Sequence, residues 1–214
     1  MKVTKVKNRG VLFTYRPDEW NLNIYVIKGK KYNFLIDTGL GSSYMDDIKK
    51  YLAYDQKEII VINTHYHWDH VWGNSSFGNQ VIISHTLCRQ LMMEKWDEVF
   101  ERNKQYCKGE VTMYLPTMTF EKELYFPEDR IRLFHSPGHT VDSISILDEE
   151  DRVLILSDNI GDDREEIIPS ISDDKDVYIN TLKVYEKLDF DTCISGHNQI
   201  LPKSIIREIL DLLS

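Results

Sequence analysis

Long apolar runs are missing from this chain of 214 residues. No stretch approaches the roughly 18 consecutive apolar residues that mark a membrane-spanning helix. The opening residues, MKVTKVKNRGVLFTY, also lack the continuous apolar segment and small-residue cleavage site of a secretory signal. We therefore expect a cytoplasmic protein with no membrane partner.

Cysteines and basic residues are also scarce. The three cysteines, Cys88, Cys107 and Cys193, are widely spaced and form no Cys-x-x-Cys pair, which argues against a disulfide framework or a cysteine-rich zinc site. We expect buried thiols instead. The net charge of −9 would repel a phosphate backbone. Acidic clusters lie at residues 46–47, 148–151, 162–166 and 173–176. We therefore expect a small-molecule substrate and do not expect nucleic acid as a partner.

The chain shows no Pro/Gly/Ser-rich linker, low-complexity block or fixed-period repeat, so we expect one domain over residues 1–214. Short β-branched and aromatic segments predict strands early in the chain, and the apolar EIIVIN predicts a fully buried strand. A helix is expected up to Leu52, capped by Ser42 or Ser43. The predicted strands are 11–15, 22–29, 32–37, 58–63, 81–84, 131–135, 143–147, 152–157 and 192–195, and the later helices are 86–106, 175–188 and 204–214. This order predicts an α/β layered sandwich.

The segment THYHWDH, residues 64–70, places three of the seven histidines and one aspartate within six residues. Side chains alternate in an extended segment, so His65 and His67 project the same way and can chelate one metal ion. Asp69 and His70 follow where the chain is expected to turn into a helix, and they offer a second pair of ligands. The segment therefore predicts two half-sites for metal.

Three later residues are candidates to complete these half-sites. His139 in SPGHT, Asp158 in LSDN and His197 in SGH each follow a predicted strand. Strand ends that converge on one rim are where α/β sheets hold their sites. His85 and His135 are not assigned to metal, and we expect them to be hydrogen-bonded residues of the core or surface.

The pattern H-x-H-x-D-H, followed by His, Asp and His at later strand ends, resembles the metallo-β-lactamase superfamily. The similarity extends to LIDTG (35–39), THYHWDHVWGN (64–74) and SPGHT (136–140). The resemblance implies an α/β fold, the αββα four-layer sandwich, with a metal site along one edge. It implies two metal positions with these ligands: His65, His67 and His139 for the first, Asp69, His70 and His197 for the second, and Asp158 bridging both.

One departure from the family pattern limits what the resemblance implies about substrate. The usual Gly-Asp at the bridging position is Ser157-Asp158 here, followed by the acidic NIGDDREE. The superfamily includes lactonases, thioesterases, nucleases, β-lactamases and diiron redox proteins, and a fold does not fix a function. Substrate assignments therefore cannot be copied from its members.

Several of these classes are not favoured by the sequence. Long glyoxalase II enzymes carry a C-terminal helical domain, whereas only seventeen residues follow His197. The nucleases need a basic surface, secreted β-lactamases an export signal, and flavodiiron proteins a flavodoxin domain. We expect a small glyoxalase II-like or lactonase-like hydrolase that acts on a neutral ester, thioester or lactone. Two Zn²⁺ ions are expected, with iron or manganese as alternatives, and Asp69 is the expected catalytic residue because it is placed to orient the attacking hydroxide or move its proton.

Other functions stay open at this point. An iron-bound redox or oxygen-handling protein would use the same ligands, and a phosphodiesterase or a binding module without turnover would share the fold. The tripeptide Asp37-Thr38-Gly39 is typical of aspartic proteases, but that function needs a second copy of Asp37 and leaves the histidines unexplained. We interpret Asp37 as support for the metal ligands. The oligomeric state is not predicted.

Aromatic residues near the motif are the candidates for substrate contacts. Trp68 and Trp72 adjoin the ligands, and Tyr66 is expected to pack away from the metals because it alternates with His65 and His67. The covering segment between residues 85 and 120 offers further candidates, which are equally compatible with ordinary packing: Trp96, Phe100, Tyr106, Met113 and Tyr114.

Overall fold

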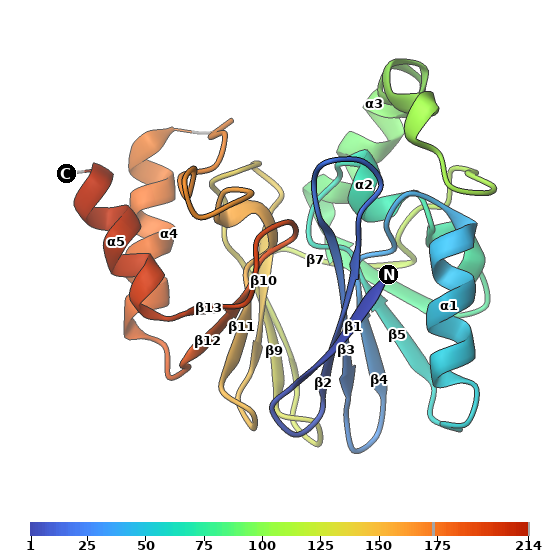
Figure 1. The fold of residues 1–214 in the computed structure, drawn as a ribbon, viewed down its shortest axis with the longest axis horizontal. Coiled ribbons are helices and arrows are strands. Elements are labelled where there is room, and N and C mark those ends of the chain that lie inside the picture. The colour runs from blue at the N-terminus through green and yellow to red at the C-terminus, as the bar shows by residue number, and fades with distance from the viewer. Residues whose placement is uncertain (173, 214) are drawn as a thin grey trace.

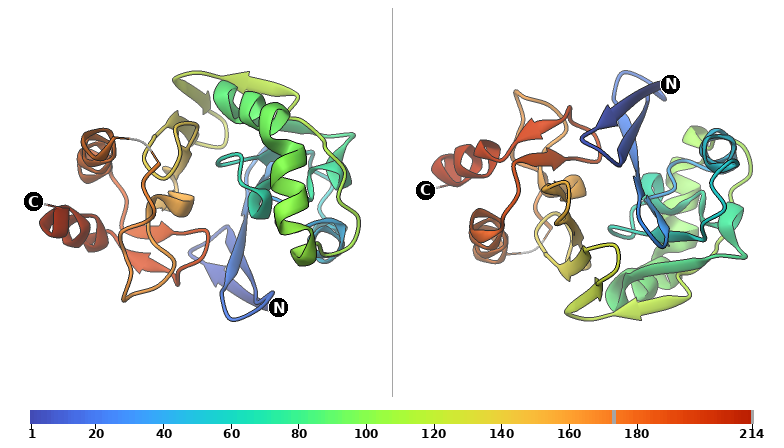
Figure 2. Two further views of the ribbon diagram at one scale, coloured as in Figure 1. Left: turned by 90° about the horizontal axis from the view of Figure 1, so that it is seen from above. Right: turned by 90° about the horizontal axis from the view of Figure 1, so that it is seen from below.

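The computed structural model describes residues 1–172 and 174–213. Asp173, in a predicted acidic cluster, and Ser214, at the end of the last predicted helix, lie outside the described residues. Two β-sheets face each other in the middle of the molecule, and helices cover their two outer faces (Figures 1 and 2). This is the αββα sandwich that the sequence predicts.

The first sheet has seven strands in the described residues, and they lie side by side in chain order. The first four form an antiparallel meander, and the last four are parallel to one another. β5 has the sequence IIVI, an apolar run typical of a parallel strand covered on both faces. The strands are β1 (Lys2–Val6), β2 (Gly10–Tyr15), β3 (Leu22–Lys28), β4 (Asn33–Ile36), β5 (Ile59–Ile62), β6 (Val81–His85) and β7 (Met118–Phe120). The helices that connect its parallel strands are α1 (Ser42–Leu52), α2 (Trp68–Val71) and α3 (Thr86–Asn103).

The second sheet runs in the order β13-β12-β11-β10-β9-β8. Its strands are β8 (Glu123–Phe126), β9 (Ile131–His135), β10 (Ile144–Asp148), β11 (Val153–Ile155), β12 (Thr192–Ile194) and β13 (Leu201–Pro202). Two helices cover its outer face, α4 (Lys175–Lys187) and α5 (Ser204–Leu213). Over the described part of the chain, no helix has the length and apolar character to cross a bilayer.

Apolar side chains fill the three spaces between the layers. Ile36 and Ile62 from the first sheet meet Ile146 and Ile155 from the second in the central cluster. A second cluster packs α1 against the first sheet, and a third packs α4 and α5 against the second. Burial of this kind contributes about 25 cal/mol per Å² of apolar surface, so the sandwich is a rigid support for the loops at its edges.

The strand directions bring the functional segments to one edge. β4 and β5 are parallel, so the chain leaves both at the same end. β9 and β11 both run antiparallel to β10, and β12 runs parallel to β11, so these three strands also share a direction. The segments that follow them meet near α2, at the upper edge of the sandwich in Figure 1.

Some local features differ from the prediction. The short strands β1, β7, β8 and β13, each at the edge of a sheet, were not predicted. α1 begins at Ser42, but its cap residue is Gly41, and no side chain caps it. The serine cap was wrong because the Ser42 hydroxyl accepts the backbone N–H of Glu110 at 2.9 Å instead. Cys88 and Cys193 are buried as expected, whereas Cys107 is only half-buried.

Candidate metal centre

The segment that follows β5 is shaped by its own hydrogen bonds. The backbone N–H of Thr64 donates to the Asp37 carboxylate at 2.8 Å, which fixes the start of the segment. The backbone N–H of His70 donates to the carbonyl of His67 at 3.0 Å and closes the first turn of α2. His65 and His67 therefore project from extended chain, whereas Asp69 and His70 project from a helical turn, as the sequence predicts.

The seven candidate ligands come together in two groups. Within each group the potential ligand atoms all lie within 4.8 Å of one another. The first group joins the Thr64–His70 segment to the loops after β9 and β11, and the second joins it to the loop after β12. The first group contains His65, His67, His139 and Asp158, and the second contains Asp69, His70 and His197.

One carboxylate oxygen stands between the two groups. Asp158 Oδ2 lies 3.3 Å from Nε2 of both His70 and His197, and 3.7 Å from Nε2 of both His65 and His139. Ligands bound at about 2.0–2.1 Å to a tetrahedral ion are separated from one another by roughly 3.3 Å. Asp158 therefore lies at ligand-to-ligand separations from histidines of both groups.

The donor atoms of the site fit a cation. His65 Nε2 and His70 Nε2 are buried, and neither has a hydrogen-bond partner among the described residues. A buried polar atom without a partner costs about 1–3 kcal/mol, and a metal ion would satisfy both nitrogens. Imidazole with carboxylate is a donor set for zinc, iron or manganese.

The opposite ring nitrogens of four histidines are held by the protein. Nδ1 of His70 lies 2.8 Å from Asp37 Oδ2, which supports the interpretation of Asp37 drawn from the sequence. Nδ1 of His65 lies 3.1 Å from the Thr64 hydroxyl. Nδ1 of His139 and of His197 each lie 2.8 Å from a backbone carbonyl, of Ser170 and Asn21 respectively. Such contacts orient an imidazole for metal binding.

Two residues beside the ligands adopt positive φ angles. Asp37 has φ 63° and Ser157 has φ 47°, a left-handed region that favours glycine. The Ser157 hydroxyl lies 2.9 Å from the Thr64 hydroxyl, so the side chain ties the Asp158 turn to the histidine segment. Ser157 thus has a contact that the family's usual glycine cannot make.

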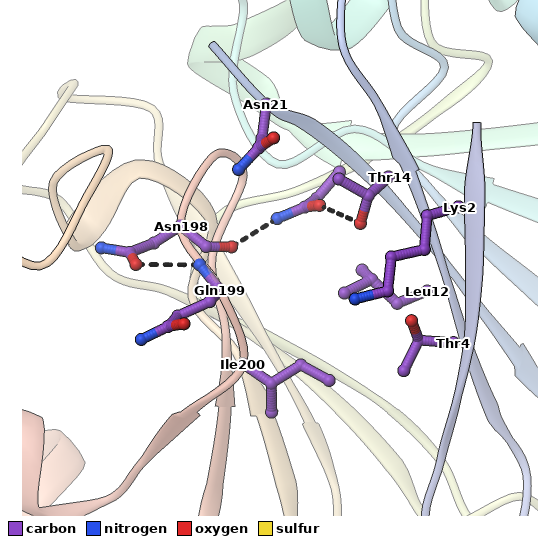
Figure 3. Close-up of a pocket in the computed structure, with 9 residues that line it drawn as sticks. Lys2, Thr4, Leu12, Thr14, Asn21, Asn198, Gln199 and Ile200 are labelled. Carbon is purple, nitrogen blue, oxygen red and sulfur yellow. Dashed lines mark hydrogen bonds between the residues drawn. The ribbon is translucent and has the colours of Figure 1, made fainter.

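The His197 loop is clamped by β3. Asn23 Nδ2 donates to the carbonyls of Ser195 and Asn198, at 3.0 and 2.7 Å, and its backbone N–H donates to Gly196 at 2.8 Å. Figure 3 shows the polar cavity of about 360 Å³ beside this clamp, between the first sheet and the loop after β12. Its lining includes Lys2, Thr14, Asn21, Gln199 and Ile200.

Burial and mutual contact perturb the ligand pKa values. Burial lowers the pKa of His65 well below its usual value, and the nearby His70 and His67 lower it further. Burial, with a contribution from a neighbouring histidine, brings the pKa of His67 to about 4. Burial also disfavours charge on His70, but the carboxylates of Asp158 and Asp69 outweigh it and raise the pKa of His70 well above normal. Metal binding to His70 must displace a proton from its ring, so the metal affinity of the site will fall as pH falls.

An aromatic wall adjoins the second ligand group. The Trp20 ring lies 5.3 Å from the His197 ring and 6.2 Å from the Trp68 ring, measured between centroids. Trp68 in turn stacks on Tyr106 at 5.2 Å. Trp20 was missed by the sequence analysis because it lies in the β2–β3 turn, far along the chain from every ligand.

The other candidates for substrate contacts lie outside this aromatic wall. Trp72 is buried and packs against Phe100, and the Tyr114 hydroxyl donates to the carbonyl of Gly78. Tyr66 packs against α3 as expected, and its hydroxyl lies 3.4 Å from Lys95 Nζ. Trp96 lines a narrow cleft beside Tyr66. Met113 is exposed. Most of these residues therefore form the support for the histidine segment.

The acidic segment after Asp158 forms a closed loop. Gly161 N–H donates to the Ile167 carbonyl at 2.9 Å, and the Asp163 carboxylate accepts the backbone N–H groups of Glu165 and Glu166. Asp162 is exposed to solvent but lies near enough to the ligand groups to interact with them electrostatically, His197 most strongly. Partial desolvation raises its pKa. One acidic side chain of this segment therefore lies within electrostatic range of the ligand groups.

His85 and His135 lie apart from the ligands. Their rings stack on each other at 4.1 Å, and neither belongs to a ligand group. His85 Nδ1 accepts the Leu87 N–H at the start of α3. Both are hydrogen-bonded, as expected: Nε2 of His85 lies 2.9 Å from the Glu121 carbonyl, and Nε2 of His135 lies 2.8 Å from the Val141 carbonyl.

Comparison with known proteins places this arrangement in a family. Residues 17–197 match the model of the metallo-β-lactamase superfamily. The chain is 25% identical over 186 residues to the beta-lactamase-like protein 2 homolog of Caenorhabditis elegans. That match covers 86% of this chain but only 58% of the longer relative.

Solved structures share the fold at low sequence identity. The metallo-β-lactamase from Pontibacter korlensis superimposes with a TM-score of 0.79 at 17% identity, covering 99% of this chain and 98% of that one. TMB-1 gives 0.80 at 15% identity, covering 99% and 96%. The metallo-β-lactamase from Hirschia baltica gives 0.77 at 14% identity, covering 99% and 97%. The chain belongs to the metallo-β-lactamase superfamily, whose members are in general metal-dependent hydrolases.

Proposed function

We propose that this protein is a dinuclear metal-dependent hydrolase of small neutral or cationic esters, thioesters or lactones. The observation that carries the proposal is the position of Asp158 Oδ2, 3.3–3.7 Å from four imidazole nitrogens that belong to two ligand groups. The proposed first position uses His65, His67 and His139, the second uses Asp69, His70 and His197, and Asp158 bridges both. Zn²⁺ is the proposed metal, with iron or manganese compatible with the same donors.

Metal ions held by these residues would lower the pKa of a bound water toward about 7 and would polarise the oxygen of the scissile group. The protein contributes the orientation of the ligands and a proton-handling group. Asp69 Oδ2 lies 3.3 Å from His197 Nε2 and 3.6 Å from His70 Nε2, and its side chain is largely buried. One of its oxygens therefore faces the second position, and the carboxylate is placed to orient the nucleophile and pass its proton to the leaving group.

The surroundings of the site support the proposed substrate class. The Trp20 ring packs edge to face against both His197 and Trp68, which places apolar surface beside the second ligand group. Asp162 adds a negative charge on the side of the second ligand group. A negative entrance repels polyanions and attracts cations, so a small substrate without negative charge fits better than a nucleic acid.

A substrate panel tests the proposal. Zinc-loaded protein should hydrolyse at least one neutral ester, thioester or lactone faster than any phosphodiester, with kcat/KM flat or rising as salt increases. A polyanion bound through a basic groove would instead lose kcat/KM steeply with salt. A phosphodiester that outperforms every neutral ester would overturn the substrate class. Coloured, iron-containing protein that is inert on the whole panel would favour the redox alternative.

Asp162 and Asp163 provide a matched pair for the charge argument. Asp162→Asn should lower kcat/KM for a cationic ester relative to its neutral isostere, because this carboxylate interacts electrostatically with the ligand groups. Asp163→Asn should not, because its side chain still accepts the backbone N–H groups of Glu165 and Glu166. Equal effects of the two substitutions would show that Asp162 has no specific influence on substrate charge.

A further inference from the structure

A buried carboxyl group lies behind the first ligand group. Asp142 belongs to the loop between β9 and β10, and none of its surface is exposed. Its carboxyl group approaches the side chain of Thr140, the backbone N–H of Tyr66 and the thiol of Cys88 on α3. None of these approaches has normal hydrogen-bond geometry, because neither carboxyl oxygen has a partner among the described residues.

A buried carboxyl group without a partner lowers the stability of the fold, whereas an apolar residue at the same position would not. A buried polar group without a hydrogen bond costs about 1–3 kcal/mol. The neighbouring cluster is apolar, formed by Val71, Trp72, Cys88 and Met92. A sequence that breaks the rules of core packing at one position does so most often where function requires it.

The neighbours of Asp142 point to that requirement. Tyr66 is the residue between His65 and His67, and Thr140 is the residue after His139. The carboxyl group thus contacts the chain beside all three histidines of the first position. The second position is held by other groups: Asp37 contacts His70, the Asn21 carbonyl contacts His197, and Asn23 clamps the His197 loop.

We propose that Asp142 is a positioning residue, which sets the distance between His139 and the His65–His67 pair and thereby the metal affinity of the first position alone. The carboxyl group lies where the histidine segment, the His139 loop and α3 meet. With this group removed, the two loops are free to separate by the small distance that spoils a three-histidine site. The inference rests on the two-ion centre proposed above and does not depend on the substrate.

Zinc affinity measured by competition with a chromogenic chelator tests the proposal, because two binding steps can be resolved without any substrate. Asp142→Ala should weaken one of the two steps by about 10- to 100-fold, the range for groups that orient metal ligands. The other step should stay close to wild type, and the melting temperature of the metal-free protein should not fall, because a buried carboxyl group without a partner has been removed. Asp142→Asn should restore most of the affinity, because its side chain has nearly the same size and shape and still fills the space between the Tyr66 and Thr140 segments. Asp142→Ser, too short to reach both loops, repeats the test if the alanine variant does not fold.

Two further variants identify which of the two metal positions is weakened by Asp142→Ala. In a His139→Ala protein, which lacks the first position, Asp142→Ala should cause no further loss of affinity. Asn23→Ala is the matched control and should weaken the other binding step. Equal weakening of both steps by Asp142→Ala, or a lower melting temperature with unchanged affinities, would overturn the proposal. Wild-type protein that binds fewer than two ions would overturn the two-ion centre itself, whereas failure to hydrolyse the panel would leave this result standing.

Discussion

Acidic side chains are buried at both edges of the sandwich, at the metal centre and at the opposite edge. The two edges differ in the partners that these carboxylates have. At the end opposite the metal centre, Asp151 accepts three hydrogen bonds from Asn8 and Arg9. Asp148 there accepts the Arg9 guanidinium at 2.9 Å and two backbone N–H groups. At the metal edge, Asp158 lies among imidazole nitrogens, two of which have no hydrogen-bond partner in the described chain.

This difference in partners indicates that the charges at the opposite edge stabilise the fold, whereas those at the metal edge serve the function. The buried carboxylates at the opposite edge are partnered by Arg9 and Asn8, although Arg9 Nη1 has no hydrogen-bond partner in the described chain, and breaking such a charge pair destabilises the fold. Buried donors that converge without satisfying one another have the form of a site that awaits a cation. Substitutions at the two edges should therefore change different quantities.

The largest effect is expected at the shared ligand. Asp158→Ala removes the oxygen common to both groups, so both metal positions weaken and kcat/KM should fall by about a thousandfold or more, roughly 4 kcal/mol of transition-state stabilisation. Asp151→Ala at the opposite edge should leave metal content unchanged. Metal analysis of both proteins checks this, and full metal occupancy in Asp158→Ala would contradict the bridging role.

The opposite edge should respond through stability. Arg9→Ala leaves Asp148 buried without its charged partner, a change that costs about 3–5 kcal/mol. Urea denaturation of the metal-loaded protein measures this loss, and its zinc content should stay at the wild-type level. Loss of zinc from folded Arg9→Ala would show that the two edges are not independent.

Asp69 should affect chemistry more than metal retention at the first position. Asp69→Asn keeps His65, His67 and His139 intact, while turnover should fall by about 10²- to 10⁴-fold, the contribution of a positioned proton-transfer group. Metal stoichiometry and kcat are measured on the same sample. If both ions are lost together, Asp69 is chiefly a structural ligand.

A histidine outside both edges gives a smaller, pH-dependent effect. Burial and the stacked His135 lower the pKa of His85, and its neutral ring caps α3 by accepting the Leu87 N–H. The unfolded chain takes up the proton first, so the stability that His85 provides is complete above about pH 6.5 and is lost as pH falls through its lowered pKa. His85→Asn is a cap that does not titrate. The melting temperature of wild type relative to this variant should therefore fall between pH 7 and pH 5, and a constant difference would exclude a role for His85 protonation.

The smallest change is expected at Ser157. Ser157→Gly relieves a positive φ that costs a non-glycine residue about 1 kcal/mol, but it removes the hydroxyl contact with Thr64, worth about 1 kcal/mol. These terms nearly cancel, so the melting temperature and kcat/KM should stay close to wild type. A large loss of activity would show that the serine has a catalytic role that its hydrogen bonds do not reveal.

The sequence could predict those parts of the site that lie next to strands. His139, Asp158 and His197 each follow a strong apolar strand, so strand direction alone placed them at one edge. Asp37 was interpretable because it ends a strand that neighbours β5. The ligands among residues 65–70 could be predicted from their residue types and their spacing.

Features that depend on tertiary contacts could not be predicted. Trp20 reaches His197 only because the β2–β3 turn folds over the edge, and Asp142 is significant only because Tyr66 lies opposite it. The Ser42 cap failed because a distant N–H, from Glu110, competes for the hydroxyl. Strand β1 has the sequence KVTKV, which mixes polar and apolar residues on both faces of an exposed sheet edge, so its periodic signal is weak.

The central claim is that two metal ions share Asp158. A crystal structure of protein purified without chelator, with metals identified by anomalous scattering, tests it most directly. The account predicts two anomalous peaks about 3.5–4 Å apart, one among His65, His67 and His139 and one among Asp69, His70 and His197, with Asp158 in contact with both. A single peak, no peak, or an ion bound away from Asp158 would contradict it.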